Sequence, residues 1–164
     1  MTNRTPRSYG SPMARQLWLL RHGEAEPHDA GPDDERRLTA RGEGQGRAAG
    51  RALAALEVTF QAVYTSPKVR ARDTARLACE ALGCEPIDHE PLRQDFTADD
   101  ARELLHGDER VLVVGHEPDF SQVVHDLTGG RIDMKKGGIA GLRMDGARGE
   151  LIVLLRPREL DRLA

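Results

Sequence analysis

The sequence predicts an α/β fold, a three-layer αβα sandwich in which a mainly parallel sheet has helices on both faces. Short apolar runs of strand length alternate with longer segments of helical periodicity along most of the chain. Such alternation is typical of parallel sheets covered on both sides. The apolar runs end in Gly, Pro or polar residues, which favour loops. At 164 residues the chain is long enough for one domain with a substantial core.

The first half of the chain should hold one strand, a loop and one helix. The apolar run at 16–21 predicts the strand, and the polar, Pro- and Gly-containing segment at 28–37 predicts a mobile loop. Thr39 is a suitable N-cap for a helix that extends to about Leu56. Several glycines in that stretch weaken the prediction, because each costs about 1 kcal/mol relative to Ala.

Strands and helices continue to alternate in the second half. A strand is expected at 61–65, and Pro67 suits the first turn of a helix that stops at Gly83. The remaining elements are expected in this order: a short strand within 86–92, a helix at 97–106 capped by Thr97, a buried strand at 110–114, a helix at 118–127, and paired strands at 138–144 and 151–155.

These elements predict a single folded domain at 16–156. An N-terminal extension at 1–15 precedes it and a C-terminal tail at 157–164 follows it. Met13 stands just before the first strand, so translation could begin there. The extension has no apolar core of the kind that a secretory signal needs.

Composition excludes several partners. The formal net charge of −3 gives no general attraction to nucleic acid or to membrane surfaces, and no run approaches the ~18 apolar residues of a membrane helix. Cys79 and Cys84 match no common zinc spacing, and we expect them to be reduced thiols. The sequence therefore predicts a cytoplasmic protein with no nucleic-acid or membrane partner.

The most informative stretch is Leu-Leu-Arg-His-Gly-Glu-Ala at 19–25, where the first strand ends. Ligands bind at the carboxyl ends of strands in open α/β sheets. An imidazole placed there, His22, can act as a nucleophile, and Arg21 beside it can hold a phosphoryl group through parallel hydrogen bonds. The alternative is that His22 is an ordinary histidine of a surface loop.

Three further clusters follow at expected strand ends or helix starts, namely Leu-Thr-Ala-Arg-Gly at 38–42, Thr-Ser-Pro-Lys-Val-Arg at 65–70 and Val-Val-Gly-His-Glu-Pro at 113–118. Arg70 lies one helical turn after Pro67, and helix geometry can direct it back over the strand end. Arg72 should point elsewhere, because positions two apart do not share a helix face. His116 could hydrogen-bond a transferring phosphate. The alternatives are a solvated helix charge for Arg70 and an ordinary histidine before a helix for His116.

With these clusters in this order, the chain resembles the histidine phosphatase superfamily, whose fold is shared by phosphoglycerate mutases and histidine acid phosphatases. The short length and the Val-Gly-His-Glu-Pro run make it most similar to the SixA-type phosphohistidine phosphatases, over roughly residues 16–156. The resemblance implies a phosphoglycerate mutase-like fold and a phosphatase in which His22 is transiently phosphorylated and then hydrolysed by water.

The expected active site follows from these residues. His22, Arg21, Arg70 and His116 are the predicted catalytic residues, and Arg21, Arg70 and His116, together with Gly23, are expected to bind the substrate. Two arginines and two histidines make a cationic pocket that is unfavourable for a divalent ion, so we expect no metal and no cofactor.

The sequence does not identify clearly which residue would act as a general acid. Mutases and broad-substrate phosphatases of the superfamily carry a carboxylate in a Leu-x-Glu context, which here reads Leu-Arg-Gln-Asp at 92–95. Gln94 cannot donate a proton as an acid, so Asp95 is the possible general acid. The chain also lacks the long insertion that covers the site in the mutases.

An open site without a strong acid favours phosphohistidine on a protein as the substrate, because a protonated imidazole leaves without help. The alternatives are a phosphomonoesterase for a small phosphorylated metabolite, such as a sugar or nucleotide phosphate, and a phosphate-binding module without turnover. The loop at 26–37 and the segment at 135–138 would border the entrance for a phosphorylated protein. Lys135 and Lys136 could equally belong to a solvated turn.

Overall fold

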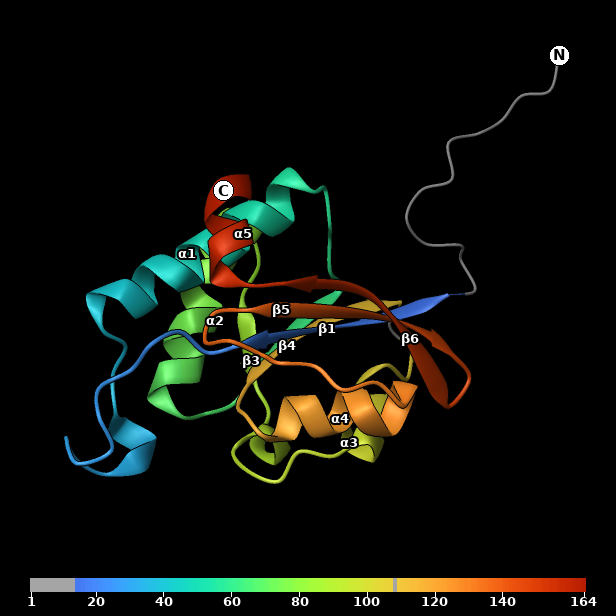
Figure 1. The fold of residues 1–164 in the computed structure, drawn as a ribbon, viewed down its shortest axis with the longest axis horizontal. Helices are drawn as coiled ribbons and strands as arrows, with labels where there is room; N and C mark the ends of the chain where they lie inside the picture. Colours follow the sequence, from blue (N-terminus) through green and yellow to red (C-terminus); the bar gives the residue numbers. More distant parts are fainter. Residues whose placement is uncertain (1–13, 108) are drawn as a thin grey trace, which may run out of the picture.

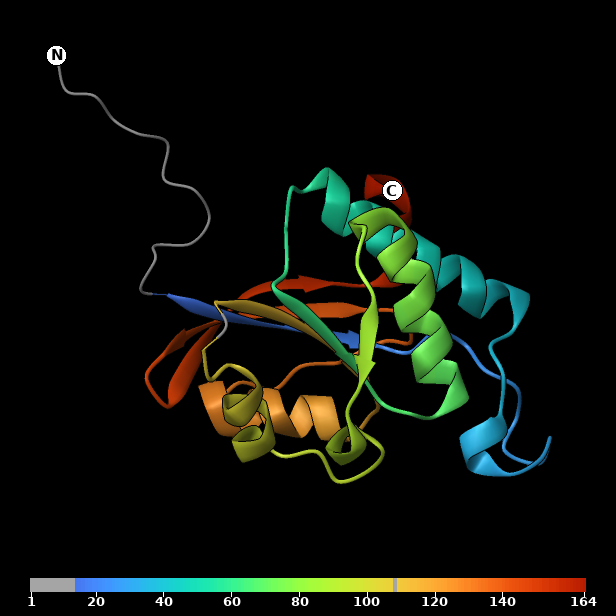
Figure 2. The same ribbon diagram turned by 180° about the vertical axis from the view of Figure 1, so that it is seen from behind.

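A six-stranded sheet forms the centre of the protein (Figures 1 and 2). The computed structural model describes residues 14–107 and 109–164, so the expected extension up to Met13 lies outside the described residues. The strands lie in the spatial order β3 (Pro86–Asp88), β2 (Ala62–Thr65), β4 (Arg110–Gly115), β1 (Arg15–Arg21), β5 (Ile139–Asp145) and β6 (Arg148–Leu155).

Four neighbouring strands of the sheet run parallel, as the sequence predicts. Strand β4 pairs in parallel with both β1 and β2, and β2 pairs in parallel with β3. Strands β5 and β6 form an antiparallel hairpin that extends the sheet beyond β1. The register aligns Arg21 with Gly115 and Thr65 with Val114, so the carboxyl ends of β1, β2 and β4 meet at one edge.

Helices cover both faces of the sheet and make three layers, as expected (Figure 1). Helices α1 (Ala40–Ala55), α2 (Val69–Leu82) and α5 (Pro157–Leu163) lie on one face. Helices α3 (Ala98–Leu104) and α4 (Asp119–Thr128) lie on the other. Two short 3-10 turns, η1 (Asp33–Glu35) and η2 (Glu90–Leu92), precede α1 and α3.

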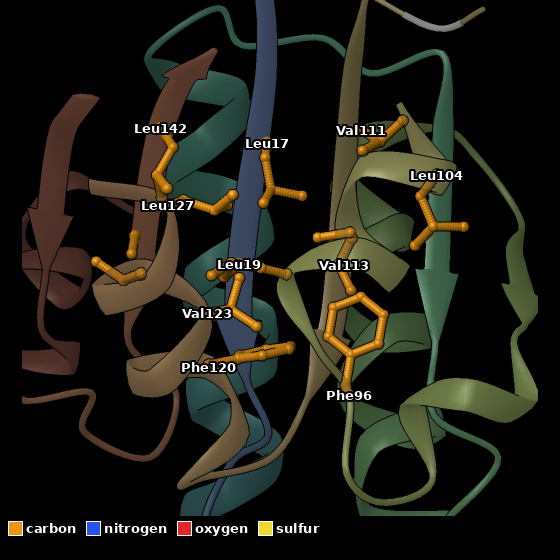
Figure 3. Close-up of a cluster of buried hydrophobic side chains, with 14 of the residues drawn as sticks. Leu17, Leu19, Phe96, Leu104, Val111, Val113, Phe120, Val123, Leu127 and Leu142 are labelled. Carbon is orange, nitrogen blue, oxygen red and sulfur yellow. The ribbon is translucent and has the colours of Figure 1, made fainter. Parts of the chain in front are cut away.

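Strand β1 supplies side chains to both hydrophobic cores. Leu17 and Leu19 pack with α3 and α4, which Figure 3 shows from the side of Val123 and Phe120. The intervening Trp18 and Leu20 pack with α1 and α2. This alternation follows from the two-residue period of a strand, and it fixes β1 in the middle of the fold.

The two long helices begin and end at residues that explain their limits. The Thr39 hydroxyl accepts a hydrogen bond from the Gly42 amide at 3.1 Å and caps α1 as predicted. Gly83 ends α2 in the left-handed conformation. The prediction for Pro67 is wrong: α2 starts at Val69, because the chain stays extended through Lys68, the residue before the first turn.

Gly50 of α1 allows this helix to pack closely on α2. A Cβ atom at Gly50 would lie 2.3 Å from the carbonyl oxygen of Ala78, a residue of α2. The two helix backbones therefore approach closely only because glycine stands there. The low helix propensity of glycine, which weakened the sequence prediction, is offset by this close packing.

Two expectations about the less regular segments need correction. Residues 157–164, expected to be a tail, form α5, whose Leu160 is buried against the α1–α2 core. The loop at 28–37, expected to be mobile, is tied down by Arg36, which donates to the Glu26 carbonyl oxygen at 2.7 Å and to the Asp33 carboxylate at 2.8 Å. Within the described ranges, every helix is too short or too polar to cross a membrane.

Candidate active site

The carboxyl edge of the sheet brings the four sequence-predicted site residues together. Arg21 is the last residue of β1 and His22 follows it, while His116 follows the last residue of β4. Arg70 lies in the first turn of α2, just after β2. The rings of His22 and His116 are 5.2 Å apart between centroids. His22, Arg70 and His116 are only 7%, 5% and 7% exposed, so neither the surface-loop interpretation of His22 nor the solvated-charge interpretation of Arg70 holds.

His22 is oriented by its own backbone. Its Nδ1 lies 2.7 Å from the Gly23 carbonyl oxygen, and a carbonyl can only accept, so Nδ1 carries the proton. Nε2 is then left with its lone pair, the form of imidazole that attacks phosphorus. Burial, together with the charges of Arg70 and Arg21, lowers the pKa of His22 to about 3. His22 is therefore neutral at physiological pH, the state that a nucleophilic imidazole requires.

His116 faces the same space and is held by a residue that the sequence analysis missed. Its Nε2 lies 2.8 Å from the hydroxyl of the fully buried Ser66. Burial, followed by the influence of His22 and Arg70, lowers the pKa of His116 to about 2. The signal for Ser66 was the Ser-Pro pair that precedes Arg70.

In both arginines, Nη1 is hydrogen-bonded to a backbone carbonyl oxygen, whereas Nε has no partner among the described residues. Arg21 donates from Nη1 to the Met134 carbonyl oxygen at 2.7 Å, and Arg70 donates from Nη1 to the Asp33 carbonyl oxygen at 2.7 Å. The buried Nε atoms of both residues have no hydrogen-bond partner within the described chain, and neither does Nδ1 of His116. A buried unpaired polar group costs about 1–3 kcal/mol. This concentration at one sheet edge indicates a place for an oxyanion, which would satisfy all three.

Asp33 and Lys68 border the site and were also missed. The Asp33 carboxylate accepts from Lys68 Nζ at 2.7 Å, from Arg36 at 2.8 Å and from Arg70 Nη2 at 3.3 Å. These cations hold the pKa of Asp33 well below its usual range, the hydrogen bond from Lys68 contributing most. Asp33 thus stays ionised and links the loop before α1 to the start of α2. No motif in the loop at 28–37 indicated that Asp33 would contact Lys68 and Arg70.

Gly23 joins His22 to α1 and α2. Its amide donates to the Thr74 hydroxyl at 3.1 Å, and that hydroxyl donates to the Arg70 carbonyl oxygen at 2.7 Å. A Cβ atom at Gly23 would lie 2.4 Å from the Gly42 carbonyl oxygen, so glycine is required at this position. The substrate-binding role predicted for Gly23 is not supported by these contacts, because both of its backbone polar groups are already engaged.

Asp95, the possible general acid, is exposed and has a left-handed backbone with φ of 59°. Beside it, Asp119 accepts from the Phe96 amide at 3.2 Å. Burial raises the pKa of Asp119, and the negative charge of Asp95 adds to the effect. Asp119 is therefore a second carboxyl group beside Asp95, and the sequence analysis did not single it out.

Arginine, lysine and histidine side chains predominate at this edge, and Asp33 is the carboxylate among them. In residues 14–107 and 109–164, no group of three or more His, Cys, Asp or Glu side chains is placed to hold a metal ion. The two arginines, Lys68 and the two imidazoles suit an anion with several equatorial oxygens.

Comparison with known families agrees with this geometry. The family model of the histidine phosphatase superfamily (branch 1) matches residues 17–104. The chain belongs to this superfamily. It is a phosphatase with the α/β fold of the phosphoglycerate mutase-like proteins, as the sequence resemblance implied.

Among its relatives, an uncharacterized protein of Picosynechococcus is 33% identical over 162 residues, which cover 88% of this chain and 98% of the relative. The phosphatase is also similar in structure to the protein histidine phosphatase SixA complexed with tungstate, with a TM-score of 0.80, 26% identity, and coverage of 88% of this chain and 99% of the other. A third similar fold, a putative alpha-ribazole-5'-P phosphatase from Escherichia coli, has a TM-score of 0.70 and 21% identity over 87% of this chain and 98% of the other.

Proposed function

We propose that this phosphatase hydrolyses phosphohistidine carried by a protein, through an intermediate phosphorylated on Nε2 of His22. The observation that carries the substrate assignment is the state of Asp33. It is the carboxylate that contacts Arg70, and three cations keep it ionised, so it cannot supply a proton to a leaving group. A pocket in which this carboxylate cannot act as an acid suits a leaving group that needs no proton.

The first step would transfer the phosphoryl group to His22. Nε2 forms the new N–P bond while the N–P bond of the substrate breaks. The substrate imidazole takes back the bonding electron pair and leaves neutral, provided that its other nitrogen is protonated. Arg21, Arg70 and His116 supply hydrogen bonds to the equatorial oxygens, where negative charge is concentrated.

In the second step, water would be the nucleophile and His22 would be the leaving group. Water attacks phosphorus, the Nε2–P bond breaks, and the water protons remain with the phosphate or pass to solvent. The hydrogen bond from Nδ1 to the Gly23 carbonyl keeps a proton on the far nitrogen of His22 throughout. His22 is therefore itself a protonated imidazole leaving group. Neither step needs a carboxylic acid, a metal or a cofactor.

The exposure of Asp95 supports this proposal, since a solvent-facing Asp95 is not positioned as a buried acid. The alternative is a phosphomonoesterase for a small phosphorylated metabolite. One observation favours it: the raised pKa of Asp119, the property expected of a general acid. A module that only binds phosphate is disfavoured by membership of a phosphatase superfamily.

The deciding experiment compares three substrates in EDTA: a protein phosphorylated on histidine, a sugar phosphate and p-nitrophenyl phosphate. We expect the highest kcat/KM for the phosphohistidine protein. The variants Asp95→Asn and Asp119→Asn should turn it over within about threefold of the wild-type rate. A loss of about 10²-fold or more in either variant, the scale of general acid catalysis, would identify a missing acid and overturn the substrate assignment.

A further inference from the structure

A basic cleft of about 430 Å³ lies next to the phosphate pocket. Six cationic side chains line it: Arg21, Arg41, Lys135, Lys136, Arg156 and Arg158. Glu24 is the one acidic residue in its lining. The cleft therefore carries a strong local positive charge on a protein whose formal net charge is −3. The mechanism described above uses only Arg21 of this set.

Backbone hydrogen bonds fix the cleft to the segment that carries the nucleophile. The Gly137 amide donates to the carbonyl oxygens of Arg21 and His22 at 3.1 and 3.0 Å, and the Arg21 amide donates to the Gly138 carbonyl oxygen at 3.1 Å. Lys135 and Lys136 lie directly before this bridge. The charge of Lys136 is the last of the contributions that lower the pKa of His22, which places this lysine close to the catalytic pocket.

Much of this positive charge is not neutralised. Within the part of the chain that the structure describes, Lys136 and Arg158 form no ion pair, and Arg41 has only a 3.6 Å contact with Glu24 while its side chain is 76% exposed. The other ion pairs, Lys135 with Asp133 and Arg156 with Glu159, join exposed side chains and are worth little in water. These charges remain available to a ligand.

The arrangement of the cations indicates what kind of anion they fit. They come from four separate segments: the end of β1, the first turn of α1, the loop before β5 and the start of α5. In the described residues, the unpaired buried nitrogens belong to Arg21, Arg70 and His116 in the phosphate pocket, and of these three residues only Arg21 also lines the cleft. Exposed and dispersed charges suit several dispersed carboxylates better than one compact phosphate, which requires convergent donors.

We propose that the basic cleft binds an acidic segment of the substrate protein, next to the phosphorylated histidine. The inference deepens the proposed function and rests on it for the identity of the phosphorylated group. Carboxylates in the cleft would orient the substrate and raise the rate of encounter, while the phosphoryl group enters the pocket between Arg21 and Arg70.

The test uses the double variant Arg41→Glu/Arg158→Glu, which touches neither His22 nor the three unpaired donors. The matched control is Arg51→Glu/Arg131→Glu, which makes the same change in net charge. Both control positions are exposed arginines without an ion pair in the described chain, and neither lines the cleft. The substrates are two peptides phosphorylated on histidine, one with acidic and one with neutral flanks, a sugar bisphosphate and p-nitrophenyl phosphate.

We expect wild type and control to prefer the acidic peptide by about 10-fold in kcat/KM at low salt, and the cleft variant to lose this preference while its turnover of p-nitrophenyl phosphate stays unchanged. A wild-type enzyme that hydrolyses both peptides without the preference, or a cleft variant that keeps it, would overturn the inference. So would a cleft variant whose defect is confined to the sugar bisphosphate, because the cleft would then serve a small molecule.

A second measurement separates this inference from the proposed function. The acidic peptide without phosphate is added as an inhibitor of p-nitrophenyl phosphate hydrolysis. Inhibition of wild type and control, but not of the cleft variant, supports the cleft even where no phosphohistidine is hydrolysed. In that case the proposed function fails and the inference stands. Equal inhibition of all three proteins, or of none, overturns it.

Discussion

Asp33 holds Arg70 twice, through its backbone carbonyl oxygen at 2.7 Å from Nη1 and through its carboxylate at 3.3 Å from Nη2. The same carboxylate contacts Lys68 and Arg36. One short turn in the loop before α1 therefore sets the orientation of the Arg70 guanidinium. The unpaired Nε of Arg70 is available for phosphate because the other two nitrogens are engaged by Asp33.

Replacing Asp33 tests this relationship. In Asp33→Ala the carbonyl contact remains, but the contacts of the carboxylate with Arg70, Lys68 and Arg36 are lost. We expect kcat for p-nitrophenyl phosphate to fall about 10-fold, because a displaced catalytic group costs rate steeply. Trypsin should also cut after Arg36 and Arg37 more readily. Unchanged kcat with unchanged proteolysis would show that the carboxylate does not position Arg70.

His22 is predicted to carry the phosphoryl group. In His22→Ala, no labelled phosphate should remain on the protein after acid-free quenching, and turnover should fall by at least about 10⁴-fold, as expected when a covalent nucleophile is removed. The wild-type protein quenched in the same way should carry an alkali-stable, acid-labile label. Label recovered from the alanine variant at the wild-type rate would place the nucleophile elsewhere.

Two glycines of α1 provide a matched pair for the packing argument. A Cβ atom at Gly42 would lie 1.9 Å from the Glu24 carbonyl oxygen, whereas a Cβ atom at Gly44 would meet nothing within 4 Å. Gly42→Ala should lower the free energy of unfolding by about 2–3 kcal/mol through steric overlap and reduce turnover by shifting the segment after His22. Gly44→Ala should raise the free energy of unfolding by about 0.5–1 kcal/mol, because alanine favours a helix. Urea unfolding of both variants measures the difference.

The buried histidines predict a loss of stability in acid. Their folded-state pKa values of about 3 for His22 and about 2 for His116 lie below the unfolded value of about 6.5. The unfolded chain therefore binds more protons in this range. The stabilisation is complete above about pH 6.5 and falls as the pH decreases towards the folded pKa, by about 1.4 kcal/mol per pH unit for each histidine.

Urea unfolding between pH 7 and pH 4 checks this slope. His22→Asn should reduce it by about 1.4 kcal/mol per pH unit, because one proton fewer is taken up on unfolding. The exposed His106 offers the control, and His106→Asn should leave the wild-type slope in place. A slope that is the same in all three proteins would mean that His22 is already protonated in the folded state.

Inhibition and chelation test the nature of the pocket. Tungstate or vanadate should inhibit competitively, because either oxyanion fits between two arginines and two imidazoles. Activity should persist in EDTA, since the donor set at the site is cationic. Titration with each oxyanion and assay after dialysis against EDTA measure these effects. Activity lost in EDTA and restored by a divalent metal would contradict the assignment.

Local sequence signals located the four central residues of the site well. Arg21, His22, Arg70 and His116 each stand at a strand end or a helix start, and parallel strands bring their carboxyl ends to one edge. The prediction that Arg72 points away from Arg70 is confirmed by its contact with Asp88 at 2.6 Å. The three-layer architecture was predictable for the same reason, because alternating strand and helix periods leave few ways to bury both kinds of apolar face.

The sequence by itself thus determined the fold class, the superfamily and the residues at the centre of the site. Only the tertiary structure decided that Asp33 holds Arg70, that Ser66 holds His116, that Thr74 ties Gly23 to α2, and that α5 completes the basic cleft. Each of these contacts joins segments far apart in the chain, and no periodicity or short motif encodes such a pair. They depend on the conformation of the loops at the carboxyl edge of the sheet, and the packing of the whole domain determines that conformation.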